Sequence, residues 1–410
     1  MKKRYNIGEL RVLFLLLFTI VATPLLADSL PLGGEGGGSS LADVLGRVSE
    51  SNPTLARYRA QADAVRADLH SALTLPDPEV ELGYLWGAPD GVGNRRDFSV
   101  SQRLDFATIF GLKRRVAQSR EALAELEYRQ GRALLLLRAT QLAVQVSHAN
   151  ALQRDYADRI ATATTLADYY ERQLSLGEVD RLVVNDARLS LAEIQAEAAS
   201  AEAERQQLIT ELALLSPSVE PEVNSALLDG LHVSEQDLRE AAAQIGSLSE
   251  IAELTALRQT DAAQAELRQA RAASLPEVTA GYMAELTRAE KFRGVTLGVS
   301  IPLWANRGNV ASARARLAAA EAQNAEDKAT MATQRRLLQL QYEAQTRLSA
   351  QIDESLQHTS SEALLRRALQ LGQISMVDYL SHRQRYYTLR RQHLDAERDA
   401  LLALAQLLLL

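Results

Sequence analysis

The 410-residue sequence has no cysteine, only 10 prolines and a low share of aromatic residues, 5%. The lack of cysteine excludes a disulfide scaffold, a thiolate metal site and a cysteine nucleophile. Alanine, leucine, glutamate, glutamine and arginine fill long tracts, and this composition favours long helices over a compact α/β enzyme. The formal net charge is −7, so there is no strongly basic footprint and we expect no nucleic acid among the partners.

The N-terminus has the pattern of a secretory signal peptide. The basic residues Lys2 to Arg4 precede an apolar run at 13–26. We predict a signal peptide over residues 1–27. An uncleaved helical anchor is the alternative, although the run is shorter than the ~20 residues that a membrane span needs. The glycine-rich residues 28–39 are expected to form a flexible leader.

The rest of the chain contains an internal repeat. Leu176-Gly177, for example, recurs as Leu371-Gly372. We predict two repeat units, at 40–216 and 235–410, joined by a linker at 217–234. Each unit has the same expected order: a helix, two short strands, a very long helix, a glycine turn and a second long helix.

The helical parts are long and almost uninterrupted. The stretches from Gly111 to Gly177 and from Gly308 to Gly372 contain no proline. At about 1.5 Å per residue, each stretch would reach on the order of 95 Å as a helix. Apolar or small residues recur at spacings of three and four, which is the periodicity of coiled coils. Two such stripes run along the last helix, from about Val377 onward, so we expect this helix to contact neighbours on two sides.

Four short segments alternate between apolar residues and small or polar ones. Each has the length of a tilted outer-membrane strand. A surface hairpin packed on its own helices would give the same alternation. In the membrane interpretation, the residues that face lipid are Val80, Leu82, Tyr84, Trp86, Phe98, Val100, Leu104, Val278, Tyr282, Val295, Leu297, Val299 and Ile301.

The number of strands predicts an oligomer if the membrane interpretation holds. Every backbone amide inside lipid must be paired, and bacterial barrels begin at about eight strands. Four strands cannot close a barrel. Two or more copies of the chain would then each contribute two hairpins.

The chain resembles the outer-membrane efflux proteins of the TolC type over residues 40–410. The resemblance rests on Asn52-Pro53-Thr54-Leu55, on the Leu-Pro pair before the first strand of each half, and on the glycine turns at 176–180 and 371–375. The stretch from Val100 to Phe106 is similar to the strand exit of the heavy-metal branch, the CusC-like and CzcC-like proteins. The order of these motifs along the chain carries the resemblance.

The resemblance implies a mainly α fold with four transmembrane strands. As a homotrimer, the duplicated unit would form a twelve-stranded β-barrel in outer-membrane lipid, continuous with a periplasmic helical barrel. The implied function is a passive exit duct for metal ions or drugs. Its implied partners are a periplasmic adaptor protein and an inner-membrane pump, and its location is the bacterial outer membrane, extending into the periplasm. The cargo stays open among a metal ion, a drug and a polypeptide.

Two glycine turns carry the candidate functional residues. A glycine after a helix is most simply an αL cap, with Asp180 and Ser375 as N-caps of the return helices. By the resemblance, the turns would form the periplasmic tip, where an adaptor docks on Gly177, Asp180, Leu182, Gly372, Ser375 and Val377. Asp378 matches the position of an aspartate in the family's gate, and the family's second acidic position falls on Ser381, a serine in this chain. Three copies of Asp378 would make an acidic ring whose like charges raise their own pKa values.

The sequence predicts neither catalysis nor a bound cofactor. There is no nucleophile elbow and no glycine-rich phosphate cradle, so we do not expect an enzyme. The six histidines show no ligand spacing with carboxylates and are expected to be scattered over solvated faces, without a metal site. The rival hypothesis is a soluble periplasmic coiled-coil adaptor or scaffold, which would need a β-rich, lipoyl-like segment between its helices.

Overall fold

The computed structural model describes residues 40–72, 74–87, 93–104, 109–217, 228–302, 306–358 and 361–410. The predicted signal peptide at 1–27 and leader at 28–39 lie outside these residues.

The two halves of the chain contain the same elements in the same order. The first half has α1 (Leu41–Ser51), α2 (Pro53–Ala72), β1 (Glu79–Leu85), β2 (Arg95–Leu104), α4 (Leu112–Ser175) and α5 (Arg181–Leu214). The second half has α7 (Glu235–Ile245), α8 (Leu248–Ala272), β3 (Glu277–Leu286), β4 (Lys291–Ser300), α9 (Arg307–His358), α10 (Ser361–Gln370) and α11 (Met376–Leu407). This order confirms the duplicated strand-and-long-helix unit, with two differences: two helices precede each pair of strands where one was predicted, and α9 and α10 of the second half correspond to α4 of the first.

Each half begins with a reciprocal capping box. Ser40 accepts a hydrogen bond from the backbone of Asp43, whose carboxylate accepts one from the backbone of Ser40, and Ser234 and Asp237 repeat the arrangement. Both pairs satisfy orphan N–H groups at the start of an 11-residue helix. The serine and the acid three residues later are a sequence signal for a helix start, and it recurs in both halves.

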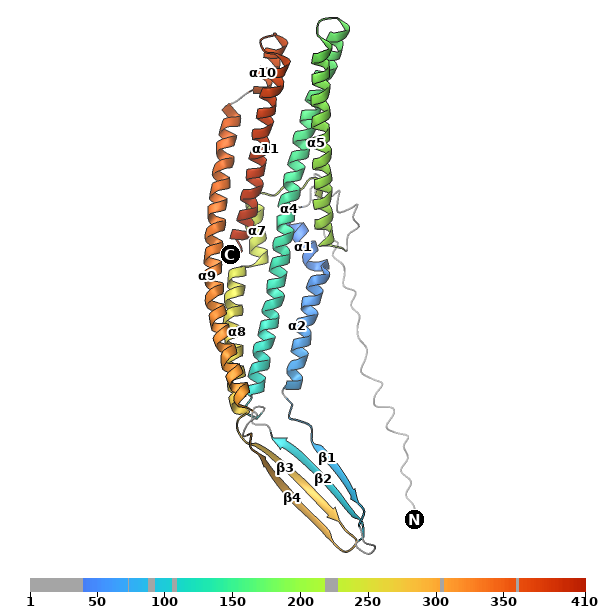
Figure 1. Cartoon of the computed structure of the whole chain (residues 1–410), viewed down its shortest axis with the longest axis vertical. Coiled ribbons are helices and arrows are strands. Elements are labelled where there is room, and N and C mark those ends of the chain that lie inside the picture. The colour runs from blue at the N-terminus through green and yellow to red at the C-terminus, as the bar shows by residue number, and fades with distance from the viewer. Residues whose placement is uncertain are drawn as a thin grey trace, which may run out of the picture. The chain divides into compact units, whose positions relative to one another are not determined.

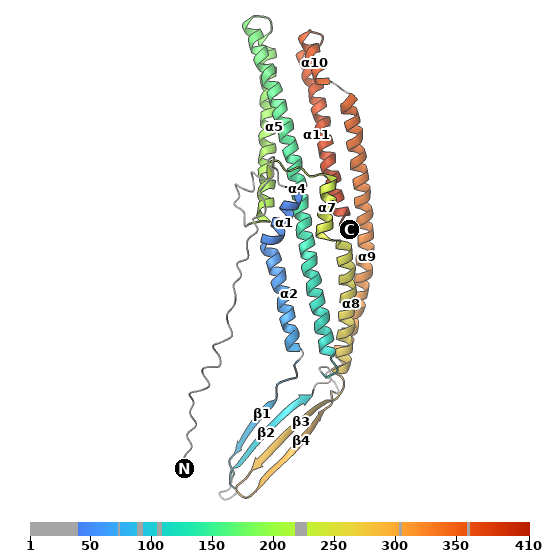
Figure 2. The ribbon, with the colours of Figure 1, turned by 180° about the vertical axis from the view of Figure 1, so that it is seen from behind.

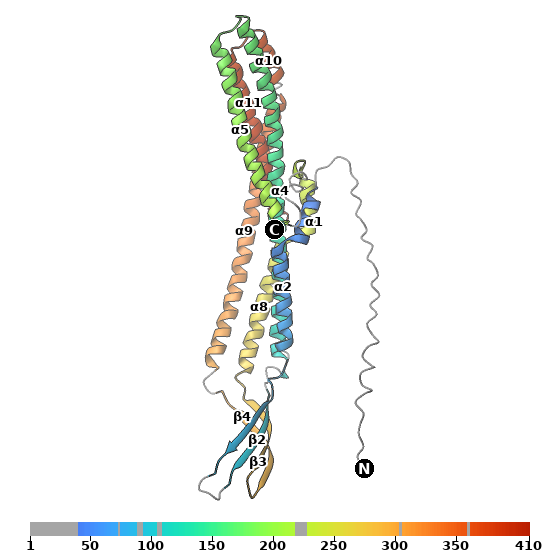
Figure 3. The ribbon, with the colours of Figure 1, turned by 90° about the vertical axis from the view of Figure 1, so that its right-hand side faces the viewer.

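The four strands form one antiparallel sheet in the order β1-β2-β3-β4. The central pair, β2 with β3, joins the two halves of the chain. Val80, Val100, Tyr282 and Val295 lie in one row across all four strands. Within residues 40–410 the sheet lies at one end of the long helices, and the turns after α4 and α10 lie at the other end (Figures 1 and 2). The view turned by 90° shows the same separation (Figure 3).

Helix α4 is the centre of the helical part. It has 64 residues, equivalent to about 95 Å, and it contacts α1, α2, α5, α7, α8 and α11. Ala133, Ala139 and Ala143 are fully buried, so neighbouring helices approach this stretch closely. Leu142 and Tyr156, two positions of the predicted coiled-coil stripe, are also buried.

The long helical segment of the second half and the last helix follow the prediction with one difference. The predicted stretch from Gly308 to Gly372 is described as two helices, α9 and α10, and residues 359 and 360 lie outside the description. Helix α11 packs against α9 and also against α4, as its two stripes predict. The main core lies where α1 and α7 pack on the middle of α4, together with the end of α11.

Candidate functional site

The strand register places every predicted lipid-facing residue on one face of the sheet. Leu82 is opposite Phe98, Leu104 is opposite Val278, and Val278 is opposite Val299. Trp86 and Ile301 directly follow β1 and β4 and continue the alternation. Large side chains of this apolar face are exposed: Val295 by 91%, Trp86 by 79% and Leu82 by 77%. No described helix covers these side chains.

The opposite face of the sheet is polar and acidic. It carries serine, threonine and glycine together with the five carboxylates of the strands: Glu79, Glu81, Asp97, Glu277 and Glu285. Arg95 pairs with Asp97 at 2.9 Å and with Glu285 at 3.2 Å. The sheet is therefore an amphipathic layer, although Leu85, Met283 and Phe292 lie on the polar face, and three cations lie on the apolar face.

Strands β1 and β4 are the edges of this sheet. Each pairs along one side only within the described chain, so one row of N–H and C=O groups is left without a strand partner. Open edges promote pairing with another strand. Inside lipid such edges would be far costlier, because no water is present to satisfy them.

The turns at Gly177 and Gly372 share one geometry. Both glycines have positive φ, 74° and 67°. After α4, Glu178 N–H donates to Gln173 O at 2.9 Å and Gly177 N–H to Leu174 O at 3.0 Å. The turn after α10 repeats both bonds at the same distances, from Gln373 N–H to Ala368 O and from Gly372 N–H to Leu369 O. This is the Schellman motif, in which a left-handed glycine closes the end of the helix.

The return helices start differently. Ser375 and Asp378 form a reciprocal capping box at the start of α11, with Ser375 Oγ 2.7 Å from Asp378 Oδ2. Asp180 occupies the N-cap of α5, but its side chain makes no capping bond. Hydrogen bonds from the Ser375 side chain and then from its backbone lower the pKa of Asp378. Within one chain this shift is opposite to the rise predicted for a ring of three carboxylates.

Three of the eight predicted tip and gate residues line clefts near the turns. Gly372 lines a cleft of about 480 Å³ between the two turns, together with Tyr169, Tyr170, Leu369 and Tyr379. Val377 and Ser381 line a second cleft between α5 and α11, beside Asp186 and Leu189. The side chains of Leu182 and Val377 are exposed.

Polar contacts between α4 and α11 were not predicted from the sequence. Arg390 Nε lies 2.7 Å from Asp155 Oδ1, and Asp155 is buried. His148 Nε2 lies 3.0 Å from Asp395 Oδ1. These partners are more than two hundred positions apart in sequence, so no local spacing indicates them.

The expectation of solvated histidines is wrong for two positions. His148 is largely buried between α4 and α11, and His393 is partly buried against Ser349, 3.2 Å from its Oγ. Burial lowers the pKa of His148, the nearby Arg398 adds to this shift, and Asp395 acts against it. His232 and His382 are exposed as expected.

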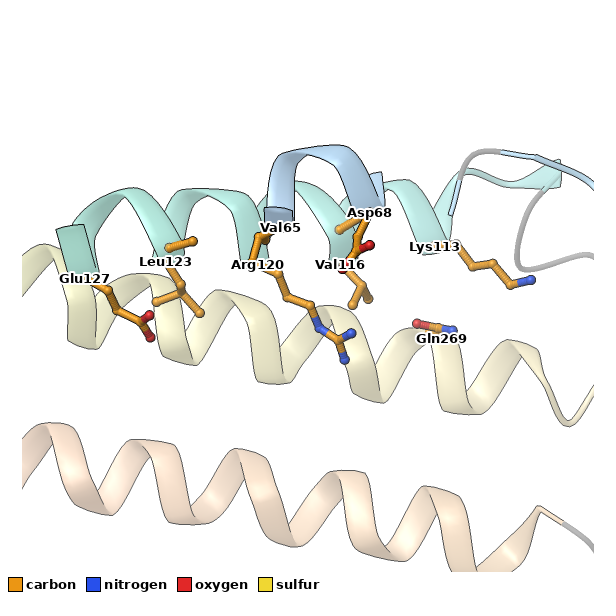
Figure 4. A pocket seen from close by; sticks show the side chains of 10 residues that line it. Val65, Asp68, Lys113, Val116, Arg120, Leu123, Glu127 and Gln269 are labelled. Carbon is orange, nitrogen blue, oxygen red and sulfur yellow. The ribbon is translucent and has the colours of Figure 1, made fainter. Parts of the chain in front are cut away.

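A third cleft lies near the sheet, between α2, α4 and α8 (Figure 4). Val65, Asp68, Lys113 and Arg120 are among its lining residues, and its volume is about 540 Å³. Arg120 pairs with Glu266 of α8 at 3.0 Å. The cleft is thus a gap between helices, and its Arg120 already has a partner within the chain.

No described cluster of three or more histidine, aspartate or glutamate side chains could hold a metal ion. Among the described helices, none has both the length and the apolar character needed to cross a membrane.

No family model and no curated protein matches the chain, whereas solved structures do. The outer membrane protein VceC of Vibrio cholerae aligns with a TM-score of 0.74 and 16% identity, over 89% of this chain and 94% of that one. CusC aligns with a TM-score of 0.67 and 19% identity, over 92% and 94%. The open state of the MtrE outer membrane channel of Neisseria gonorrhoeae gives 0.67 and 16%, over 90% and 88%. CusC and MtrE thus have the same TM-score, and the heavy-metal branch is not singled out. The chain has the fold of these outer-membrane proteins and channels along almost its whole described length.

Proposed function

We propose that this chain is one of three identical protomers of an outer-membrane exit duct. The observation that carries the proposal is the exposed apolar face of a sheet that has two open edges. Exposing such an apolar face to water costs free energy, whereas contact with lipid is favourable. Three copies would supply twelve strands, and pairing β4 of one copy with β1 of the next would satisfy both edges.

The polar face of the sheet supports the same arrangement. Closing the sheet with its apolar side outward turns Glu79, Glu81, Asp97, Glu277 and Glu285 toward the lumen. A barrel of about twelve strands is wide enough to hold water, which can solvate these carboxylates. The duct would then conduct passively, without chemistry on its cargo.

The helices give the duct its second part. With the sheet in the outer membrane, α4, α5, α9 and α11 extend into the periplasm, and their turns form the tip. An adaptor protein coupled to an inner-membrane pump would dock around Gly177, Asp180, Leu182, Gly372, Ser375 and Val377. Asp378 and Ser381 would lie at the narrow aperture. The cargo class is a metal ion or a drug, and similarity to the strand exit of the heavy-metal branch favours the metal ion.

The rival function is a soluble periplasmic adaptor or scaffold. That function requires the hairpins to pack on the helices of the chain itself. The exposure of Leu82, Trp86 and Val295 disfavours it, because a soluble monomer would leave the whole apolar face in water.

Cell fractionation combined with cysteine cross-linking tests the proposal. The natural chain has no cysteine, so introduced pairs react without background. We would scan pairs that join Glu79 or Glu81 of β1 to Thr296, Gly298 or Ser300 of β4, all on the polar face. At least one pair should form disulfides that link three chains into a covalent trimer in outer-membrane fractions. Each single-cysteine control should give at most a dimer, because one cysteine forms only one disulfide. A soluble monomer released by osmotic shock would exclude the duct.

A further inference from the structure

The carboxylates of the described strands lie on one face of the sheet, whereas the cations lie on both faces. All five carboxylates of the described strands lie on the polar face, whereas Arg96, Lys291 and Arg293 lie on the apolar one. Arg96, Leu286 and Lys291 share the last row before the strand turns, and Arg293 lies one row further in, beside Ala284. The apolar face therefore ends in a rim of cations near the strand turns. This end of the sheet lies far from the helices (Figure 1). We call these three cationic residues the basic rim.

The basic rim is compact. Neighbouring strands lie about 4.8 Å apart, and residues two positions apart on a strand are about 6.8 Å apart. Arg96 and Lys291 are thus separated by two strand spacings, and Arg293 lies beside Lys291 on the same strand. Long side chains from these positions can converge on one ligand with two anionic groups.

The cations of the basic rim are available for a ligand. All three are exposed, and none forms an ion pair with another residue in the described ranges. Arg96 lies over the ring of Tyr84 at 5.7 Å, and its N–H groups have no carboxylate partner among the described residues. Arg95, next along the chain but on the polar face, has two carboxylate partners.

Aromatic residues mark the depth of the basic rim. Tyr84 and Trp86 make an edge-to-face contact at 5.2 Å, and Asn94 donates to the Tyr84 hydroxyl at 2.6 Å. Such aromatic side chains gather where a membrane meets water. Cations in the same row therefore lie at the depth of lipid headgroups.

We propose that the basic rim binds the phosphate groups of an outer-leaflet glycolipid, one such site on each protomer. The proposal rests on the proposed function, because the strand turns face outward only if the helices lie in the periplasm. A phosphorylated lipid supplies anions at the depth where the chain offers unpaired cations beside an apolar surface. Arginine suits this role, since its planar guanidinium binds phosphate oxygens through two parallel bonds.

Lipid binding by the purified, detergent-solubilised protein tests the proposal. The probes are bisphosphorylated lipid A and its dephosphorylated form in mixed micelles. The variant R96Q/K291Q/R293Q removes the basic rim, and R314Q/K328Q/R335Q removes the same charge from exposed positions on α9. Each lost cation near a membrane surface weakens binding about fivefold, so the rim variant should bind bisphosphorylated lipid A on the order of a hundredfold less tightly. The α9 variant should bind bisphosphorylated lipid A as tightly as wild type.

The outcomes separate the two proposals. Wild-type protein that is absent from the outer membrane refutes the duct, and with it the basic rim. Wild-type protein that is trimeric in the outer membrane but binds both forms of lipid A equally refutes only the rim. This comparison uses the unaltered chain, so it holds even if the triple variant fails to fold. Equal binding by rim variant and wild type, or competition by millimolar inorganic phosphate, also refutes the rim.

Discussion

Arg383 of α11 donates from Nη2 to the main-chain oxygen of Arg159 of α4, 3.0 Å away. Both side chains are buried, and the ring of Tyr387 lies 4.4 Å from the guanidinium of Arg159 and 5.3 Å from that of Arg383. Nε and Nη1 of Arg383 have no hydrogen-bond partner in the described chain. Buried donors without partners reduce stability. This arginine pair is therefore a weak point of the α4–α11 interface.

Arg383→Met should stabilise the protein. Methionine fills a similar volume and removes the unpaired buried donors, so the free energy of unfolding should rise by about 1–3 kcal/mol. Arg383→Ala, which leaves a cavity, should lower it. Thermal unfolding of the purified protein measures both, and a lower midpoint for the methionine variant would contradict the argument.

His148 should make stability depend on pH. Because burial lowers its pKa, the unfolded chain binds a proton below about pH 6.5 that the folded chain does not bind. Stability should therefore fall as the pH decreases below 6.5, by at most about 1.4 kcal/mol per pH unit. His148→Asn should flatten this decline, and His232→Asn, an exposed control, should not. Denaturant unfolding between pH 5 and 7.5 provides the comparison, and equal slopes would refute it.

The effect of Gly131→Ala in α4 on the free energy of unfolding should change sign when Tyr58 is replaced by alanine. A Cβ at Gly131 would lie 2.6 Å from Cε2 of Tyr58 on α2. Gly131→Ala should therefore destabilise the wild type, although alanine favours a helix by about 1 kcal/mol over glycine. In a Tyr58→Ala background the same change should stabilise. A double-mutant cycle of unfolding free energies checks this, and the same sign in both backgrounds would be the contrary result.

Leu297 and Thr296 are neighbours on β4 that point to opposite faces of the sheet. Leu297→Lys places a charge on the proposed lipid face, which costs about 2–4 kcal/mol near the middle of a membrane. Thr296→Lys places it toward the proposed lumen and should be tolerated. The amount of trimer in outer-membrane extracts measures the difference. Equal yields would argue against a lipid-facing β4.

Asp378 should favour cations at the tip. Asp378→Asn should lower the ratio of cation to anion permeability in planar bilayers, because three carboxylates at a narrow aperture attract cations. Glu326→Gln, an exposed change on α9, serves as the control. An unchanged ratio for Asp378→Asn would place this residue away from the narrowest point.

The sequence predicted the local features well because each depends on neighbours in the chain. Alternation with period two assigned Val80, Leu82 and Val295 to one face before any pairing was known. The glycine turns and the Ser375–Asp378 capping box also follow from spacings of a few residues. The internal repeat gave the order of elements in both halves.

The features missed by the sequence depend on contacts between distant segments. His148 was expected in solvent, but Asp395 and other residues of α11 bury it in the folded chain. These residues lie more than two hundred positions away, so the sequence around His148 gives no sign of them. Arg159 and Arg383, whose guanidinium groups both lie over the ring of Tyr387, come from opposite halves of the chain. Arg96 and Lys291 were not recognised as neighbours, because two strand pairings must be known before they share a row.

The sequence by itself determined which side chains alternate, where the glycine turns end the long helices, and that the unit occurs twice. Those properties come from backbone geometry over a few residues. Only the tertiary structure decided the sheet order, the gathering of Arg96, Lys291 and Arg293 at one end of the apolar face, and the burial of charged groups between α4 and α11. The reason is physical: strand register and helix packing are fixed by long-range contacts, and local periodicity carries no information about which partner a residue meets.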